Sequence, residues 1–454
     1  TQSRGLGDVY KRQALRPKPC QLAPPPELAQ VIAGWLRPRY AHDKSLSCEH
    51  LLRQHNMGAI CNHTTSAAYR RAVPALLAVL WAGAAQAEES PSKQVFDQAW
   101  ASARLWQSSD GEETLALSGR LQADSYWFSA DKKDVPPGAD DEANDLLWRR
   151  FRFGFITEFG GGFVAHLEAD LDLNNDLGDI YDRLTDAYFS YSFSKTIKVK
   201  LLKQSVGYTL DGATSSKSLL TLQRNNVTNN LWATEEYFSG LQVSGSLDKN
   251  WSYRVGVFSG DDDEEIGFDD VGYFSLFSLD YNFAEELQIN EATVRVDYVY
   301  NDKDEDNESD VSNNGTSDFT HTTTLATLWD WGHWGLRTDI SAGHGMGGFA
   351  RQSDIWGVAV MPFYSFNEYH QIVLRYTYLD SSDDNGIRLG RYERELVSGR
   401  GDEYNEIYLG YNLHFYGQKL KWQTGLQYTD MSDAADDGGD YSGWGLTTGL
   451  RMYW

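Results

Sequence analysis

The sequence predicts an all-β fold, a transmembrane up-and-down antiparallel β-barrel of about 16 strands with long loops at one end. Three observations indicate this fold. Short segments alternate apolar and polar residues with a period of two, short turns alternate with long and mostly acidic connections, and the last segment ends on an aromatic residue, Trp454. Together these features are typical of barrels that cross the bacterial outer membrane.

The beginning of the chain does not share this pattern. No Met occurs before Met57, and residues 1–56 are rich in Pro and Arg without a sustained hydrophobic period. We therefore expect residues 1–56 to be a spurious or disordered leader, with a genuine disordered extension as the alternative.

Residues 57–87 have the features of a secretory signal peptide. Arg70 and Arg71 supply a positive start, residues 72–84 form a short apolar run, and residues 85–87 (AQA) resemble a cleavage site. The run is too short for a membrane-spanning helix, which needs about 20 residues. The signal predicts export, and together with the barrel it predicts the bacterial outer membrane as the location.

Composition excludes several classes of protein. Cleavage after Ala87 leaves 454 − 87 = 367 residues, with 40 − 11 = 29 basic and 65 − 4 = 61 acidic residues and a formal net charge of −32. Such a chain repels nucleic-acid phosphates, so we expect no nucleic-acid partner. All three cysteines precede the cleavage site, which excludes disulfides and thiolate metal sites from the exported chain.

The expected barrel occupies residues 113–454. Residues 88–112 precede it and lack its alternation, so we expect a short periplasmic segment there, either a helix or an extended plug at the pore entrance. Within the barrel, apolar residues recur at every second position, for example at Leu115/Leu117/Leu121, Phe151/Phe153/Phe155, Trp251/Tyr253/Val255, Val294/Val296/Tyr298, Ile372/Leu374/Tyr376 and Ile407/Leu409/Tyr411. A soluble β-sandwich with one face in its core can show the same alternation.

The connections favour the membrane barrel over the sandwich. Short connections lie at residues 160–162, 194–196, 248–250 and 367–368, and long, mostly acidic ones lie at residues 131–145, 261–270, 301–313, 381–385 and 432–440. Because the two kinds alternate, up-and-down topology places every long connection at one end, as in outer-membrane proteins. We expect these loops to be extracellular and to form a solvated acidic rim.

The stretch Lys203–Trp232 differs from the other long connections. It carries Lys217, Arg224 and a cluster of leucines at 219–222 in place of a run of acids. It is the third long connection, and we expect it to fold into the bore of the barrel.

Most strand arginines and lysines share the parity of the polar face. A charge that faces lipid costs about 2–4 kcal/mol at the middle of the bilayer, so these side chains should line the lumen. On this ground, nine candidate pore-lining and anion-binding residues are Arg120, Arg150, Arg152, Lys198, Lys200, Arg254, Arg295, Arg337 and Arg375. Lys203, Lys217 and Arg224 of the third long connection complete a set of twelve candidates. Acids of the same parity, such as Glu168, Asp297 and Glu406, can pair with them, so a polar lumen without anion preference is the alternative. Strict alternation places Arg149 on the lipid face.

Three motifs resemble the phosphate-selective porin O and P family. Leu105–Gln122, with Gly-Arg-Leu-Gln at its end, looks like the first strand of that family. Arg149-Arg150-Phe151-Arg152 is similar to its Arg-Arg pair on the second strand, and Lys198–Arg224, with Thr-Ser-Ser-Lys at 214–217, is similar to its third-loop region.

The resemblance implies a sixteen-stranded, usually trimeric barrel whose third long loop narrows the channel. It also implies that basic residues guide phosphate or polyphosphate, and the matching positions are Arg149, Arg150, Lys203, Lys217 and Arg224. The sequence departs from the family at residues 205–206, where Ser-Val stands in place of the frequent Pro-Phe, and at Asp211, which adds an acid nearby.

We therefore expect an outer-membrane porin for passive diffusion of small hydrophilic solutes, with anions such as phosphate or polyphosphate favoured. Its expected partners are the lipid bilayer, lipopolysaccharide, small anionic solutes and two further copies in a homotrimer. No G-x-S-x-G, H-E-x-x-H or P-loop motif is present, so we expect neither enzyme activity nor a cofactor. The alternatives are a general or weakly cation-leaning porin, an outer-membrane barrel enzyme, and a soluble secreted β-sandwich.

Overall fold

A computed structural model describes residues 91–175, 179–232, 236–260, 265–268, 272–302, 319–345 and 353–454. The predicted leader (1–56) and signal peptide (57–87) lie outside these residues. The described residues belong to one compact unit, Glu88–Trp454. None of its described helices is long and apolar enough to cross a membrane.

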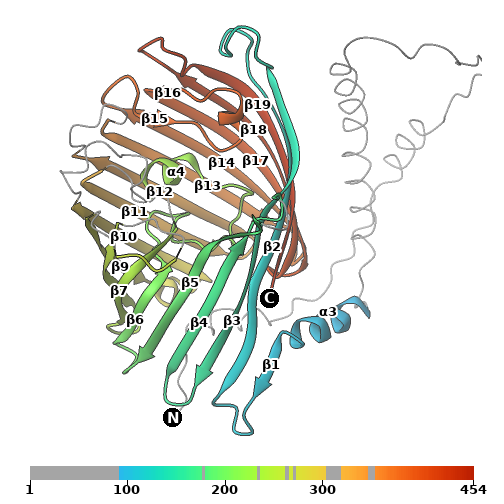
Figure 1. Cartoon of the computed structure of the whole chain (residues 1–454), viewed down its shortest axis with the longest axis vertical. Coiled ribbons are helices and arrows are strands. Elements are labelled where there is room, and N and C mark those ends of the chain that lie inside the picture. The colour runs from blue at the N-terminus through green and yellow to red at the C-terminus, as the bar shows by residue number, and fades with distance from the viewer. Residues whose placement is uncertain are drawn as a thin grey trace, which may run out of the picture. The chain divides into compact units, whose positions relative to one another are not determined.

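Sixteen antiparallel strands of the described chain form a closed barrel (Figure 1). In chain order they are β2 (Thr114–Ser129), β3 (Glu142–Phe159), β4 (Phe163–Leu171), β5 (Tyr181–Ser192), β6 (Lys198–Ser205), β7 (Tyr237–Ser246), β8 (Trp251–Ser259), β9 (Tyr273–Asn282), β10 (Glu291–Asp302), β11 (His321–Trp331), β12 (Trp334–His344), β13 (Ile355–Ser365), β14 (His370–Ser381), β17 (Glu403–Tyr416), β18 (Leu420–Ser432) and β19 (Tyr441–Tyr453). The last strand, β19, pairs with the first, β2. The predicted fold class is confirmed.

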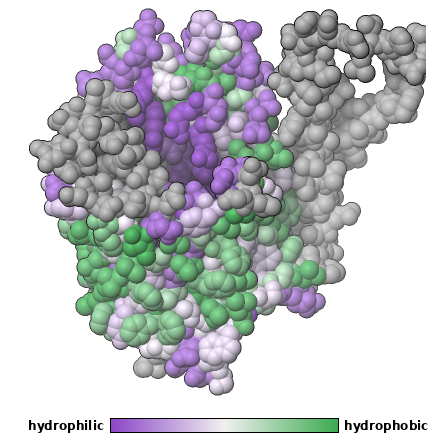
Figure 2. Space-filling model, in the orientation of Figure 1, coloured by the Kyte–Doolittle hydropathy of each residue, from purple (hydrophilic) through white to green (hydrophobic). Residues whose placement is uncertain are grey.

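The period-two pattern sets the two faces of the wall. On β3, Phe153 and Phe155 are exposed on the outer face. Arg152, the residue before Phe153, points inward and is buried. Successive side chains of a strand point to opposite faces, so one face meets lipid and the other meets the lumen. Figure 2 shows apolar residues gathered over the strands and a hydrophilic hollow at the end with the long connections.

Long and short connections alternate around the barrel, as the sequence predicts. We number the long ones L1 to L8: they join consecutive strands at residues 130–141, 172–180, 206–236, 260–272, 303–320, 345–354, 382–402 and 433–440. The expectation for L7 was wrong, because it runs far beyond residues 381–385. It contains β15 (Ile387–Arg388), the 3-10 turn η4 (Glu393–Glu395) and β16 (Arg400–Gly401).

L3 folds into the bore, as predicted. Its helix α4 (Asn226–Leu231) packs against β12, β13 and β14 (Figure 1). Val227 and Leu231 of α4 are fully buried in a cluster with Ile355 and Leu379 of the wall. Asn225 caps α4 by accepting a hydrogen bond from the backbone N–H of Thr228 at 2.8 Å. The hydrophobic core therefore lies inside the barrel, between loop and wall.

The segment before the barrel forms the helix α3 (Pro91–Ala101) and the short strand β1 (Arg104–Gln107). The Trp100 indole packs on Tyr416 at 5.2 Å between ring centroids and donates a hydrogen bond to the Tyr453 carbonyl. β1 pairs with the start of β2, beyond the point where β19 ends. It thereby covers a strand edge that would otherwise be unpaired.

Candidate functional site

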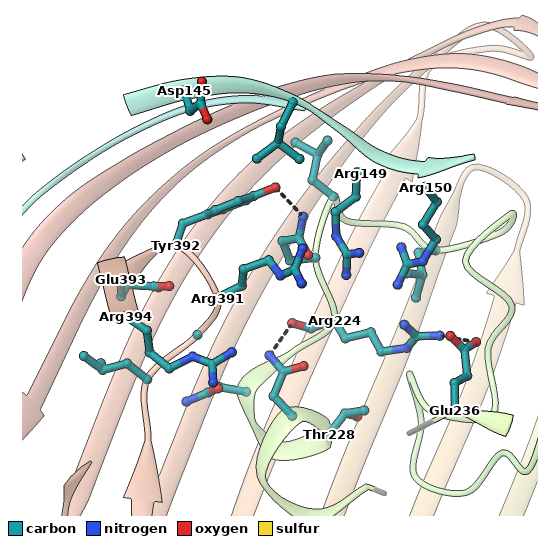
Figure 3. A pocket seen from close by; sticks show the side chains of 18 of the residues that line it. Asp145, Arg149, Arg150, Arg224, Thr228, Glu236, Arg391, Tyr392, Glu393 and Arg394 are labelled. Carbon is teal, nitrogen blue, oxygen red and sulfur yellow. Dashed lines mark hydrogen bonds and ion pairs between the residues drawn. The ribbon is translucent and has the colours of Figure 1, made fainter. Parts of the chain in front are cut away.

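A cavity of about 870 Å³ lies against L3 and is walled by β3, β4, L3 and L7 (Figure 3). Its lining is dominated by charged side chains. Nine arginines (149, 150, 152, 183, 224, 375, 388, 391 and 394) face seven carboxylates (Asp145, Asp170, Asp172, Asp182, Glu236, Glu393 and Glu406).

Several of these arginines are neutralised by ion pairs. Arg375 donates two hydrogen bonds, of 2.7 and 3.0 Å, to the two carboxylate oxygens of Glu406. Glu236 of L3 lies 3.2 Å from Arg224 and 3.6 Å from Arg152. These pairs are buried, so they fix the positions of their side chains rather than offering free charge.

Four other arginines have no such partner. Among the described residues, no carboxylate lies within 4.0 Å of Arg149, Arg150, Arg391 or Arg394. Arg150 donates to the amide oxygen of Gln122 at 3.0 Å, and the buried Nε of Arg149 has no hydrogen-bond partner in the described part of the chain. These four side chains therefore bring positive charge to the cavity lining that no carboxylate of the described residues pairs with.

Strict alternation predicts that Arg149 faces lipid, and this was wrong. Arg149 lines the cavity beside Arg150 (Figure 3). The register of β3 against β2 shifts here, since Gln122 is opposite Arg150 while Ala123 is opposite Trp148. Arg149 is thus the extra residue of a β-bulge, which changes the phase of the strand. The bulge places two consecutive arginines on the same side of the wall.

Other predicted cations hold L3 in place. Arg254 donates to the Gly207 carbonyl at 2.8 Å, and Arg295 donates to the Thr209 carbonyl at 2.6 Å. Arg375 donates to Thr221 and to the Gln223 carbonyl, each at 3.0 Å, and Arg120 donates to Ser216 at 2.6 Å. These bonds run from the barrel wall to successive points along the loop.

The remaining predicted residues lie outside the cavity. Lys217 lies over the Tyr453 ring at 5.1 Å, and Lys200 lies over the Tyr188 ring at 4.0 Å. Lys203 donates to the Glu265 carbonyl of L4 at 2.6 Å, and Arg337 pairs with Glu291 at 3.0 Å. Lys198 begins β6, near the short-turn end. Of the twelve candidates, only Arg150, Arg152, Arg224 and Arg375 line the cavity.

Residues 115–324 match the sequence model of the phosphate-selective porin O and P family. The chain is an outer-membrane porin, and over these residues it is similar to that family. No curated protein sequence matches it.

Solved structures show the same fold. The anion-selective porin from Comamonas acidovorans superposes with a TM-score of 0.52 at 15% identity, covering 76% of this chain and 100% of its own. OmpF of Salmonella typhi, in complex with daunomycin, superposes with a TM-score of 0.55 at 12% identity. The match covers 77% of this chain and 100% of the OmpF chain. The outer membrane channel DcaP of Acinetobacter baumannii superposes with a TM-score of 0.50 at 12% identity. The match covers 77% of this chain and 99% of the DcaP chain. Since the porin lies in the bacterial outer membrane, its short turns are periplasmic and its long loops extracellular.

Burial and neighbouring charges shift the pKa of several loop groups of the porin. Desolvation and the nearby Arg120 lower the pKa of Lys217 to about 8. Burial raises the pKa of Glu393, in L7, to about 7. Burial alone would raise the pKa of Glu236, but Arg224 and Arg152 outweigh it and hold that pKa well below its usual range.

The sequence interpretation missed the three L7 arginines, Arg388, Arg391 and Arg394, as well as Arg183. A signal for L7 was present. Residues 386–400 contain four arginines, so this stretch departs from the acidic character of the other long connections in the same way as L3.

Proposed function

We propose that the porin favours small anions, including phosphate and polyphosphate, and that they bind in the cavity against L3. The observation that carries this proposal is the pair Arg149 and Arg150 on the bulge of β3, which line the cavity and have no carboxylate partner among the described residues.

Guanidinium groups suit this role because they donate paired hydrogen bonds to phosphate or carboxylate oxygens and stay charged at all working pH values. Arginines held in fixed positions also raise the local concentration of anions at a constriction. The name of the family and the anion-selective neighbour point to the same class of solute.

The predicted site residues have different roles in this proposal. Arg150 contacts the solute from the cavity, and Arg152, Arg224 and Arg375 line the same cavity with their charges paired to carboxylates. Lys198, Lys200, Lys217 and Arg120 attract the solute on the periplasmic side of L3. Arg254 and Arg295 act indirectly, since they position L3, and Lys203 and Arg337 contribute charge at a distance.

We further propose that diffusion through this porin is passive and involves no chemical step, and that it works as a homotrimer in contact with lipopolysaccharide. Residues 57–87 serve as its export signal, residues 88–112 as its periplasmic segment and residues 113–454 as its barrel, and residues 1–56 take no part in function.

A general or weakly cation-leaning porin is the second candidate. It is favoured by the seven carboxylates of the cavity and by the net charge of −32 left after cleavage (29 basic and 61 acidic residues). Acidic mouths repel anions before they reach the arginines.

The reversal potential of single channels in a planar-bilayer salt gradient separates the two candidates. We expect anion preference for the unchanged porin, and a shift toward cations for Lys217→Glu and for Arg224→Glu. Lys249→Glu is the control, because Lys249 is exposed on a periplasmic turn and pairs only with Glu285 at 3.4 Å among the described residues. Cation preference in the unchanged porin, or equal shifts in all three variants, would refute the proposal.

A further inference from the structure

L7 is a second loop that folds into the lumen. Ile387, Leu389, Tyr392 and Val397 of L7 are buried in the same cluster as Val227 and Leu231 of L3. The Tyr392 ring stacks on Tyr126 of β2 with 4.1 Å between centroids. A surface loop would keep such side chains near solvent, so L7 is an interior element of the barrel.

L7 is also attached to L3 by polar contacts. The Arg388 carbonyl accepts hydrogen bonds from the side-chain amides of Asn226 and Asn230, each at 3.0 Å. The Arg388 N–H donates to Asn230 Oδ1 at 2.9 Å. Tyr392 donates to Asp124 of β2 at 2.7 Å and accepts from Gln223 of L3 at 3.3 Å. These contacts fix the backbone of L7 against both the constriction loop and the wall.

Arg391 and Arg394 project from this fixed backbone. They are exposed, and Tyr392 and Glu393 between them are buried. Arg394 lies in the 3-10 turn η4 (Glu393–Glu395), Arg391 lies two residues before that turn begins, and both side chains line the cavity. Neither guanidinium group has a hydrogen-bond or ion-pair partner among the described residues.

Two pairs of arginines thus meet in one cavity from different elements. Figure 3 shows Arg149 and Arg150 coming from β3 and Arg391 and Arg394 coming from L7. The cavity of about 870 Å³ is of the size that holds molecules with many atoms, and a single phosphate ion fills only a small part of it. A small ion can engage one pair, whereas an extended ion with several charges can engage both.

We propose that L7 is a second selectivity loop, and that Arg391 and Arg394 act with Arg149 and Arg150 to select anions that carry more than one charged group. This inference rests on the proposed anion preference and names the solute class within it. The L7 arginines are specificity-determining residues, and they lie on the extracellular side of the L3 constriction.

The test compares orthophosphate with tripolyphosphate, which share one chemistry and differ in length. Each is added to the extracellular side, and the concentration that halves the chloride current through single channels is measured. In the unchanged porin, we expect tripolyphosphate to act at a concentration about tenfold lower, because additional charged hydrogen bonds form. In R391A/R394A, we expect tripolyphosphate to need about the same half-blocking concentration as orthophosphate. The half-blocking concentration of orthophosphate itself changes by less than about twofold.

Two further variants sharpen the result. R391K/R394K keeps the charge and restores part of the tripolyphosphate block. Lys132→Ala removes an exposed cation from L1, where Lys132 lies 3.7 Å from Asp141, and leaves both values unchanged. Heat-modified migration of unboiled protein verifies that each variant folds.

Three outcomes of these block measurements would contradict the proposal. Equal loss of block by both ions in R391A/R394A, no loss for either ion, or no tripolyphosphate advantage in the unchanged porin would overturn the role of L7. Failure of the underlying anion preference is detected separately, because the salt-gradient reversal potential needs no phosphate.

Discussion

At the scale of single residues, the position of a cation decides whether it attracts a solute or holds the protein together. Arg149 and Arg295 are both arginines of the wall. Arg149 has a buried Nε without a partner among the described residues, whereas Arg295 donates to the Thr209 carbonyl and pairs with Asp297 at 3.1 Å. The position of an arginine along its strand determines whether its side chain faces the lumen. The groups around that side chain then determine whether it binds the protein or a solute.

Lys217 provides a pH-dependent test at this scale. Its pKa of about 8, lowered by desolvation and then by Arg120, means that it is largely charged at pH 7 and loses its charge as the pH rises through about 8. We therefore expect anion preference, measured as reversal potential, to fall between pH 7 and pH 9. Lys217→Arg stays charged and should flatten this dependence. The same fall in that variant would show that another group is responsible.

The sequence could predict most residue directions but not the one at Arg149. Alternation predicts that Arg120, Arg152 and Arg375 point inward, because a regular strand alternates its faces, and all three side chains are buried. A bulge interrupts this count, and nothing in the order of the side chains from Leu146 to Arg152 marks where the register shifts. The pairing with β2 sets the bulge, and that pairing is a property of the folded sheet.

At the scale of elements, L3 and L7 show what loop composition can reveal. L3 was predictable because it has basic residues and leucines in place of acids. L7 carries the same departure over residues 386–400, but its apolar residues also resemble strand sequence. Their burial depends on contacts with Val227 and Leu231 of L3, which are distant along the chain.

The closure of the barrel depends on another element contact, between β2 and the end of the chain. A Cβ added to Gly119 would lie 2.4 Å from the Arg152 carbonyl oxygen and 2.6 Å from the Trp454 ring. Gly119→Val should therefore destabilise the closed barrel by about 1–3 kcal/mol, as overpacking does. The expected readout is a lower temperature for loss of the fast-migrating band of unboiled protein.

Gly160→Ala is the matched control for this change. In the turn between β3 and β4, an added Cβ comes no closer than 3.8 Å to any neighbour, here a carboxylate oxygen of Glu113. The control should migrate and melt like the unchanged porin. If Gly119→Val did the same, close packing at the junction of β2 and β19 would not contribute to barrel stability.

At the scale of the whole molecule, buried ion pairs and open arginines divide the lumen between structure and transport. Asp339 of β12 accepts the Leu210 N–H at 2.9 Å, and Lys421 of β18 donates to the Leu219 carbonyl at 2.8 Å, so separate strands of the wall hold the same loop. A constriction held at many points keeps a fixed width. The charges left unpaired in the cavity can then act on solutes at defined positions.

This division predicts different effects for two arginines of equal charge. Arg295→Met removes the bond to L3 and should weaken that anchor by about 1.5–3 kcal/mol, the usual worth of a hydrogen bond to a charged group. We expect larger and noisier single-channel conductance with little change in reversal potential. Arg337→Met is the matched control, since Arg337 bonds to Glu291 and the Trp329 carbonyl, away from L3. If Arg295→Met changed selectivity while leaving conductance and noise unaltered, Arg295 would belong with the solute-binding arginines, and the width of the pore would be set elsewhere in the lumen.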